Sequence, residues 1–199
     1  YGADALGFIF FKDSKRYIEP EAALEIIRNL SLFIAKVGVF VNIGPDEINH
    51  IAQKTGLTAV QLHGEEPPEW IKQLDRPAIK AFRVKPGFDF NQMSMYQDCS
   101  YLLDAYSETE YGGTGKVFDW SIIPAGLRRK IILAGGITSE NAEEILKRIK
   151  ISELSKKVGI PYTVTNASYF DIFETNALGA ISYWKGFQIE KANHYAMAY

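Results

Sequence analysis

Short apolar runs alternate with amphipathic segments along most of this chain, and no other feature constrains its fold as much. Residues 5–11 (ALGFIFF) contain no polar side chain, which is typical of a strand buried on both faces. Pro20 then opens a segment whose apolar residues recur at helical spacing, and proline is common at a helix start. The predicted strands span residues 5–11, 36–41, 59–62, 78–84, 101–106 and 130–133. The predicted helices span residues 20–30, 45–54, 68–74, 90–98, a short piece near Trp120, and 139–149.

Six strand–helix units in series predict an α/β fold with a parallel sheet and right-handed crossovers. A closed eight-stranded barrel and an open doubly wound sheet both fit this pattern. Polar or glycine residues stand at or just after the ends of several strands: Gln61, His63, Arg83, Asp104, Gly135 and Gly136. A barrel collects such strand ends over one face, whereas an open sheet concentrates them near one switch point. We therefore predict a (β/α)8 TIM-type barrel.

The predicted barrel is incomplete, because six units leave it two short. We expect one unit before Tyr1, which is not a methionine, and one after Lys150. Residues 1–150 are then units two to seven of the barrel, and residues 151–199 form an aromatic-rich tail without arginine. The tail offers a strand at 161–165 and a helix at 168–177. A divergent eighth unit, a fused segment and an out-of-frame end all remain open for it.

Charge and motif content exclude several classes of function. The net charge of −2 gives no basic footprint for nucleic acid or an anionic membrane. No apolar run approaches the roughly 20 residues of a membrane span. Cys99 is the single cysteine, so we expect no internal disulfide and a cytoplasmic location. Neither zinc spacing nor a dinucleotide or P-loop glycine motif is present, so we expect no metal and no cofactor.

Asp104 is the strongest catalytic candidate, because it interrupts the apolar strand YLLDAY. Burying a carboxylate is costly unless it is paired or lies at the strand end. At the mouth of a barrel such a group can donate or accept a proton. The alternative is a structural aspartate that accepts backbone hydrogen bonds.

Two glycine pairs are candidates for ligand binding through the backbone. Gly112 and Gly113 follow the strand of Asp104, and glycine lets a backbone approach a ligand closely, although a simple tight turn is the more common explanation of such a loop. Gly135 and Gly136 join a strand to the helix at Ser139, whose N-terminus points toward them. Loops after the seventh and eighth strands of such barrels often bind phosphate. The alternative is a sharp turn.

Three other side chains are candidates for substrate binding. Arg16, in SKRYI, follows the first strand and is suited to clamp a carboxylate bidentately, the alternative being a solvated loop arginine. Arg83 stands near a strand end and either binds a ligand or pairs with a neighbouring carboxylate. His63, in QLHG, acts as a base, a ligand-binding group or a hydrogen-bonded structural histidine.

Taken together, these segments resemble the phosphoribosylanthranilate isomerase family of tryptophan biosynthesis. The matching stretches are GADALGFIF with SKRYI, KVGVFVN, AVQLHG, IKAFRV, LLDAY with YGGTGKVFDW, and ILAGGIT with EN. They occur in the family's order over residues 1–149. The resemblance implies a cofactor-free aldose–ketose isomerase that performs an Amadori rearrangement on a small phosphorylated substrate, N-(5-phosphoribosyl)anthranilate. It implies a monomer or a homodimer.

The resemblance also implies roles for particular residues. Asp104 matches the general acid, Arg16 the contact to the anthranilate carboxylate, and Gly135 with Gly136 the first half of the phosphate site. The family's general base is a cysteine in a Cys-Gly motif, which is absent here, and the tail lacks the family's Ser-Ser-Gly run. An inactive fragment that retains at most phosphate binding is therefore an alternative. Another is a different phosphate-binding barrel enzyme, although Lys36, Lys80 and the isolated His63 fit those enzymes poorly.

Overall fold

The structure is a computed structural model that describes residues 4–106, 119, 122–124, 131–136, 163–164 and 181–184. Several predicted features lie outside these residues. They are the Gly112–Gly113 loop, the helical piece near Trp120, the helix at 139–149 and the tail helix at 168–177. Within the described ranges, no helix has the length and apolar character that a membrane span requires.

Strands and helices alternate along the chain as the apolar pattern predicts. The elements are β1 (Ala5–Ile9), α1 (Pro20–Arg28), β2 (Ala35–Phe40), α2 (Pro45–Thr55), β3 (Ala59–Leu62), η1 (Pro68–Gln73), β4 (Ala78–Val84), η2 (Phe90–Met95), β5 (Cys99–Ala105), β6 (Ile131–Leu133), β7 (Thr163–Val164) and β8 (Ile181–Trp184). Both α1 and α2 have proline in their first turn, and α2 ends at Gly56 in the left-handed conformation.

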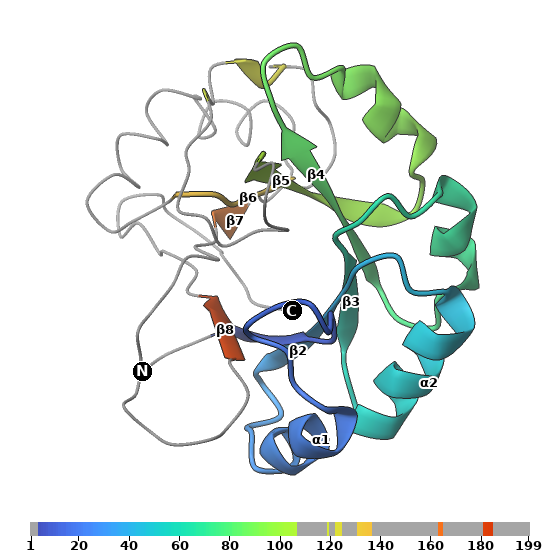
Figure 1. Cartoon of the computed structure of the whole chain (residues 1–199), viewed down its shortest axis with the longest axis vertical. Helices are drawn as coiled ribbons and strands as arrows, with labels where there is room; N and C mark the ends of the chain where they lie inside the picture. The colour runs from blue at the N-terminus through green and yellow to red at the C-terminus, as the bar shows by residue number, and fades with distance from the viewer. Residues whose placement is uncertain are drawn as a thin grey trace.

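The sheet has the order β7-β6-β5-β4-β3-β2-β1-β8, and the six strands β1 to β6 are parallel to one another. The order follows the sequence without the reversal that defines a doubly wound sheet. The strands curve around an interior, and α1, α2, η1 and η2 lie on the outer side (Figure 1). The predicted barrel architecture is confirmed as a parallel β/α half-barrel of six strands.

Some predicted elements differ in type or extent from those observed. The segments at 68–74 and 90–98 are short 3-10 helices of six residues each, not α-helices. Both lack a sustained apolar stripe, and each ends at a residue in an extended conformation, Leu74 or Tyr96. The predicted helix at 90–98 and the predicted strand at 101–106 leave Cys99 in the connection between them, but Cys99 is the first residue of β5. It therefore lies at the opposite end of that strand from Asp104.

Two short tail strands flank the half-barrel. β7 runs parallel to β6, with Thr163 opposite Ile132, inside the strand predicted at 161–165. β8 was not predicted, and it pairs antiparallel with β1, Trp184 lying opposite Ala5. Strands of a (β/α)8 barrel are all parallel, so β8 departs from that architecture. It covers the backbone hydrogen-bonding groups that the edge of β1 would otherwise expose.

Side chains alternate between the two faces of the sheet and form separate clusters. Phe8, Phe40, Val60 and Leu62 pack with residues of α1 and α2 on the outer face, while Phe82, Tyr101 and Leu103 continue this layer. The inner face carries a smaller cluster of Ala81, Leu102 and Ala134. Since successive strand residues point to opposite faces, Arg83 shares the inner face with Ala81, and Asp104 shares it with Leu102.

Candidate functional site

Asp104 lies near the carboxyl end of β5 and is 4% exposed. Its Oδ1 accepts a hydrogen bond from the Ala105 N–H at 2.8 Å. Its Oδ2 lies 3.4 Å from His63 Nε2, which belongs to the residue directly after β3. The structural role, in which Asp104 accepts a backbone hydrogen bond, is therefore present. Its second carboxylate oxygen faces the buried side chain of His63. The structure brings together two residues that are 41 positions apart in the sequence numbering.

Gln61 completes a row of three buried polar side chains. Its Nε2 lies 2.6 Å from His63 Nδ1, and Gln61 is 2% exposed. With the Gln61 amide nitrogen facing Nδ1, Gln61 donates to that atom, and a neutral His63 then carries its proton on Nε2, toward Asp104. Among the described buried side chains, Gln61 Oε1 and His63 Nε2 have no hydrogen-bond partner, because the 3.4 Å contact lacks hydrogen-bond geometry. These two atoms and Asp104 Oδ2 are available to hydroxyl groups of a ligand.

Gly135 packs directly against Asp104. It follows β6, has φ of 86°, and is followed by Gly136 with φ of 63°. A Cβ atom at position 135 would lie 2.7 Å from the Ala105 nitrogen and 2.8 Å from Asp104 Oδ1. Only glycine fits this close approach, because real Cβ atoms essentially never show such contacts. The turn thus forms a wall of the Asp104 site.

Arg83 lies on β4 opposite Asp104 in the parallel register. Its Nη2 forms an ion pair with Glu65 Oε1 at 2.5 Å, and its guanidinium carbon lies 5.7 Å from the centre of the Tyr106 ring. Glu65 is 75% exposed, so this pair sits at the rim and contributes little stability. Of the two readings of Arg83, the structure shows the pairing with a neighbouring carboxylate.

Arg16 lies in the loop between β1 and α1, and three strands separate β1 from β5 in the sheet. Its backbone N–H donates to Ser14 Oγ at 3.2 Å. The neighbouring Tyr17 hydroxyl donates to Glu19 Oε2 at 2.8 Å. Partial burial, followed by the hydrogen bond and the negative charge of Glu19, raises the pKa of Tyr17 to about 12. Tyr17 therefore remains a neutral donor at physiological pH.

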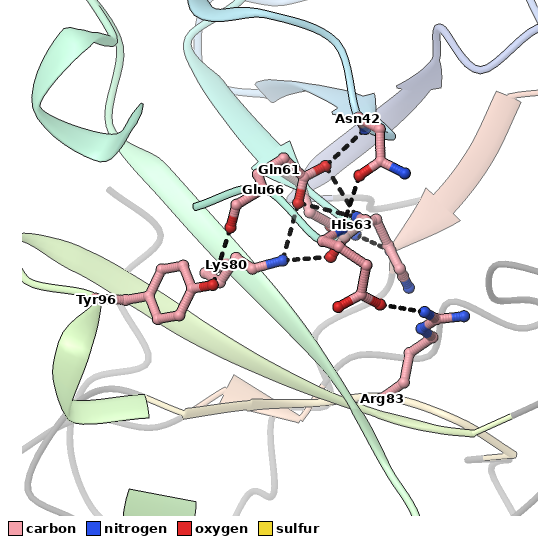
Figure 2. A network of polar contacts seen from close by, with 9 residues as sticks. Asn42, Gln61, His63, Glu66, Lys80, Arg83 and Tyr96 are labelled. Atoms are coloured by element: carbon pink, nitrogen blue, oxygen red, sulfur yellow. Dashed lines mark hydrogen bonds and ion pairs between the residues drawn. The ribbon is translucent and has the colours of Figure 1, made fainter. Parts of the chain in front are cut away.

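Glu66 is the central residue that the sequence analysis missed. Its carboxylate accepts hydrogen bonds from the backbone N–H groups of Asn42 and Gly64, both at 2.9 Å, and pairs with Lys80 Nζ at 2.9 Å. Figure 2 shows these groups converging beside His63. A signal was available, because Lys80 interrupts the apolar strand AIKAF much as Asp104 interrupts its own. No local signal marks Glu66, which stands in the polar stretch GEEPPE.

Tyr96, the residue directly after η2, is the last member of this network. Its hydroxyl donates to the Glu66 backbone carbonyl at 2.9 Å, and Lys80 Nζ lies 5.7 Å from the centre of its ring. Burial, followed by the negative charge of Glu66, raises the pKa of Tyr96. The hydroxyl therefore stays protonated and keeps donating to the loop that follows β3.

Gly64 is tightly enclosed by the network, which leads to a first prediction. A Cβ atom at this position would lie 2.3 Å from Asn42 Oδ1 and 2.8 Å from Glu66 Oε1. We expect Gly64→Ala to lower the free energy of unfolding by about 1–3 kcal/mol, as overpacking usually does. Urea unfolding measures this loss. Gly44→Ala is the matched control, because a Cβ there meets nothing within 4 Å. A loss no larger for Gly64→Ala than for the control would contradict the packing described.

A groove of about 560 Å³ lies elsewhere, between the loop after β1 and α2. Its floor is apolar, with Phe10, Val41 and Ile51, and Glu19 and Glu47 stand at its rim. None of Gln61, His63, Arg83 or Asp104 lines it, so its shape has no bearing on the Asp104 site. Among the described residues, no group of three or more His, Cys, Asp or Glu side chains is arranged to hold a metal ion.

Comparison with known proteins identifies a family for this chain. Residues 1–160 match the family model described as "N-(5'phosphoribosyl)anthranilate (PRA) isomerase". The curated N-(5'-phosphoribosyl)anthranilate isomerase of Trichlorobacter lovleyi is 42% identical over 151 residues, which are 75% of this chain and 74% of that protein.

Solved structures of the same kind of protein share the fold. One is a phosphoribosyl anthranilate isomerase in complex with reduced 1-(o-carboxyphenylamino)-1-deoxyribulose 5-phosphate. It is 34% identical with a TM-score of 0.69, over 90% of this chain and 81% of that one. Another comes from "mutually generated monomers" of the dimeric Thermotoga maritima isomerase. It is 34% identical with a TM-score of 0.64, over 84% of this chain and 76% of that one.

Proposed function

This chain belongs to the phosphoribosylanthranilate isomerase family of tryptophan biosynthesis, and from that premise we propose the reaction and the residues that carry it. The proposed reaction is the Amadori rearrangement of N-(5-phosphoribosyl)anthranilate to the corresponding 1-deoxyribulose 5-phosphate aminoketose. The observation that carries the assignment to this site is the buried Asp104 carboxylate, which faces His63 on the inner side of the half-barrel.

The rearrangement requires protons to move at defined atoms. A proton must reach the ribose ring oxygen so that the C1–O bond breaks and the anthranilate nitrogen, which keeps its own proton, forms an iminium ion with C1. A proton must then leave C2, which gives an enolamine. Finally C1 must gain a proton while the C2 hydroxyl group loses its own, which forms the C2 carbonyl. We assign the first transfer to Asp104, because a protonated carboxyl group can donate to the ring oxygen. The buried setting of Asp104 keeps competing water away from that proton.

A second group that accepts the C2 proton would accelerate the rearrangement further. In the family this role belongs to a cysteine, and Cys99 does not supply it, because it begins β5 at the far end from Asp104. We propose His63 as a substrate-binding group, since its Nε2 and the Gln61 Oε1 atom lack hydrogen-bond partners among the described residues. We propose that Arg83, through its ion pair with Glu65, fixes the position of the loop at the rim of the Asp104 site.

The two ends of the substrate have separate proposed contacts. Gly135 and Gly136, with the loop of Gly112 and Gly113, are proposed to approach the phosphorylated sugar through backbone N–H groups. This proposal is supported by the left-handed turn at Gly135 and Gly136, directly beside Asp104. Arg16 is proposed to bind the anthranilate carboxylate, because a guanidinium matches that group bidentately.

Arg16→Ala tests the proposed carboxylate contact. A charge-assisted hydrogen bond contributes roughly 1.5–3 kcal/mol, so its loss should raise KM by about 10- to 100-fold and leave kcat nearly unchanged. Steady-state kinetics of the rearrangement separate the two constants. Arg28→Ala is the control, since Arg28 is an exposed residue in the last turn of α1. An unchanged KM for Arg16→Ala would remove Arg16 from the substrate site.

Association of two copies is proposed in the form of a homodimer. Leu32 and Phe33, between α1 and β2, are each 92% exposed, and adjacent exposed apolar side chains favour a protein partner. A dimeric homologue exists. A cytoplasmic location remains a prediction from the single cysteine.

Complementation tests the proposed function in a cell. A tryptophan auxotroph that lacks the isomerase should grow without tryptophan when it expresses this chain, and Asp104→Asn at equal expression should not support growth. Absence of growth with folded, well-expressed protein would contradict the proposal. If that protein still bound inorganic phosphate, the alternative of an inactive phosphate-binding chain would take its place.

A further inference from the structure

Lys80 and Glu66 form a buried ion pair on the outer side of the sheet. Lys80 lies on β4 with Ala78 and Phe82 as its same-face neighbours, whereas Arg83 lies on the inner face. The Lys80 and Glu66 side chains are 3% and 0% exposed. The strand itself therefore separates both charges from the inner face, where Asp104 lies. Neither residue is placed to touch a substrate there.

Each buried charge has several partners. Lys80 Nζ donates to the Gly64 carbonyl at 2.7 Å and to Glu66 Oε2 at 2.9 Å, and it lies 5.7 Å from the centres of the Phe82 and Tyr96 rings. A buried ion pair is weak support for stability, because the cost of removing two charges from water offsets their attraction. In some proteins such pairs instead fix one conformation of the chain.

The conformation fixed here is that of the loops after β2 and β3. The Glu66 carboxylate binds the Asn42 N–H beyond β2 and the Gly64 N–H beyond β3, and Asn42 Oδ1 accepts from the Glu65 N–H at 2.7 Å. Asn42 itself has φ of 54°, a left-handed conformation that asparagine tolerates and that surrounding contacts must hold. Figure 2 shows these bonds surrounding the backbone next to His63.

The loop held in this way carries His63, which faces Asp104, and Glu65, which pairs with Arg83. His63 directly precedes Gly64, and its backbone N–H donates to the Phe40 carbonyl at 2.8 Å. Its ring faces Asp104 at 3.4 Å. Glu65, between Gly64 and Glu66, holds Arg83 on the neighbouring strand. A shift of the loop therefore displaces the His63 ring relative to Asp104 and releases the partner of Arg83.

We propose that Glu66 and Lys80 are positioning residues of the isomerase, whose buried ion pair holds His63 and Arg83 in register with Asp104. The inference rests on the proposed function for its kinetic consequence, but its structural consequence stands independently. Removing the Glu66 charge should loosen the loop and disturb the proton chemistry more than the binding of the substrate.

Glu66→Gln in the full chain tests this proposal with two readouts. In ¹H–¹⁵N and ¹H–¹³C NMR spectra, we expect the Asn42 and Gly64 amide signals and the His63 ring signals to move, because two charge-assisted bonds weaken. In steady-state kinetics, we expect kcat to fall by about 10²-fold, the effect of a small displacement at the reacting centre, with a much smaller change in KM. Glu69→Gln, the same change at an exposed residue of η1, should leave both readouts at wild-type values.

The two readouts distinguish failure of the inference from failure of the proposed function. If the wild-type chain shows no turnover, the proposed function fails, and the NMR signals still test the positioning. Unmoved Asn42, Gly64 and His63 signals in folded Glu66→Gln would overturn the inference, and so would a wild-type kcat. If Glu66→Gln does not fold, the same measurements apply to the double variant Glu66→Gln/Lys80→Met, which removes both charges of the pair.

Discussion

Asp104→Asn is expected to lower kcat for the rearrangement by about 10²–10⁴-fold, the range that general acid catalysis contributes. Asparagine has nearly the same shape as aspartate, and its amide oxygen can still accept the 2.8 Å hydrogen bond from the Ala105 N–H. It has no acidic proton to give to the ribose ring oxygen. The substitution therefore removes the chemistry and leaves the packing against Gly135 in place. Single-turnover or steady-state kinetics at saturating substrate measure the loss.

The control for this variant is Asp98→Asn. Asp98 is exposed, precedes the same strand and has φ of 60°, a conformation that asparagine adopts as readily as aspartate. We expect wild-type kcat for Asp98→Asn and wild-type urea unfolding for both variants. If Asp104→Asn keeps more than about a tenth of the wild-type kcat, Asp104 is not the general acid.

Of the variants proposed here, Lys80→Met should lower the free energy of unfolding the most, by about 3–5 kcal/mol. Methionine fills most of the volume of the lysine side chain, but it leaves the Glu66 carboxylate, which is 0% exposed, without a counterion. It also leaves the Gly64 carbonyl without the donor that lies at 2.7 Å. Equilibrium unfolding in urea, followed by circular dichroism, measures the change.

Lys36→Met is the matched control for the Lys80 substitution. Lys36 is 6% exposed near the start of β2, and its Nζ donates to the Ser31 carbonyl at 3.1 Å. Its replacement removes a buried ammonium group but leaves the ion pair of Glu66 intact, so we expect a smaller loss in the free energy of unfolding. Adding Glu66→Gln to Lys80→Met should recover part of the lost stability, since no unpaired buried charge remains. Equal losses for Lys36→Met and Lys80→Met, with no recovery in the double variant, would contradict the account of the pair.

The sequence predicts the strands well where burial on both faces leaves an unbroken apolar run. β3 and β4 have the predicted bounds, and β1, β2, β5 and β6 differ from prediction only at their ends. The polar side chains near the strand ends also lie where the sequence predicts. His63 follows β3 directly and faces Asp104 on β5, with β4 between the two strands. A barrel brings strand ends together by its topology, which the alternation of elements already implies.

The Glu66 network could not be predicted, because its contacts join residues far apart in sequence. Glu66 binds Asn42 across 24 positions and Lys80 across 14. Lys80 and Asp104 each interrupt an apolar strand, and sequence alone does not say which face of each strand is inner. Only the packing of Ala81 and Leu102 on one face, and of Phe82 and Leu103 on the other, separates the two roles. No repeating pattern in the sequence predicts the antiparallel pairing of β8 with β1.

Turnover by the purified 199-residue chain tests the central claim most directly. The chain is incubated with N-(5-phosphoribosyl)anthranilate, and the aminoketose is separated and quantified against the uncatalysed reaction, with Asp104→Asn assayed beside it. The account predicts formation of the aminoketose by the wild-type chain well above the uncatalysed rate, and its loss in Asp104→Asn. Formation at the uncatalysed rate by folded wild-type protein, or equal formation by both proteins, would contradict it.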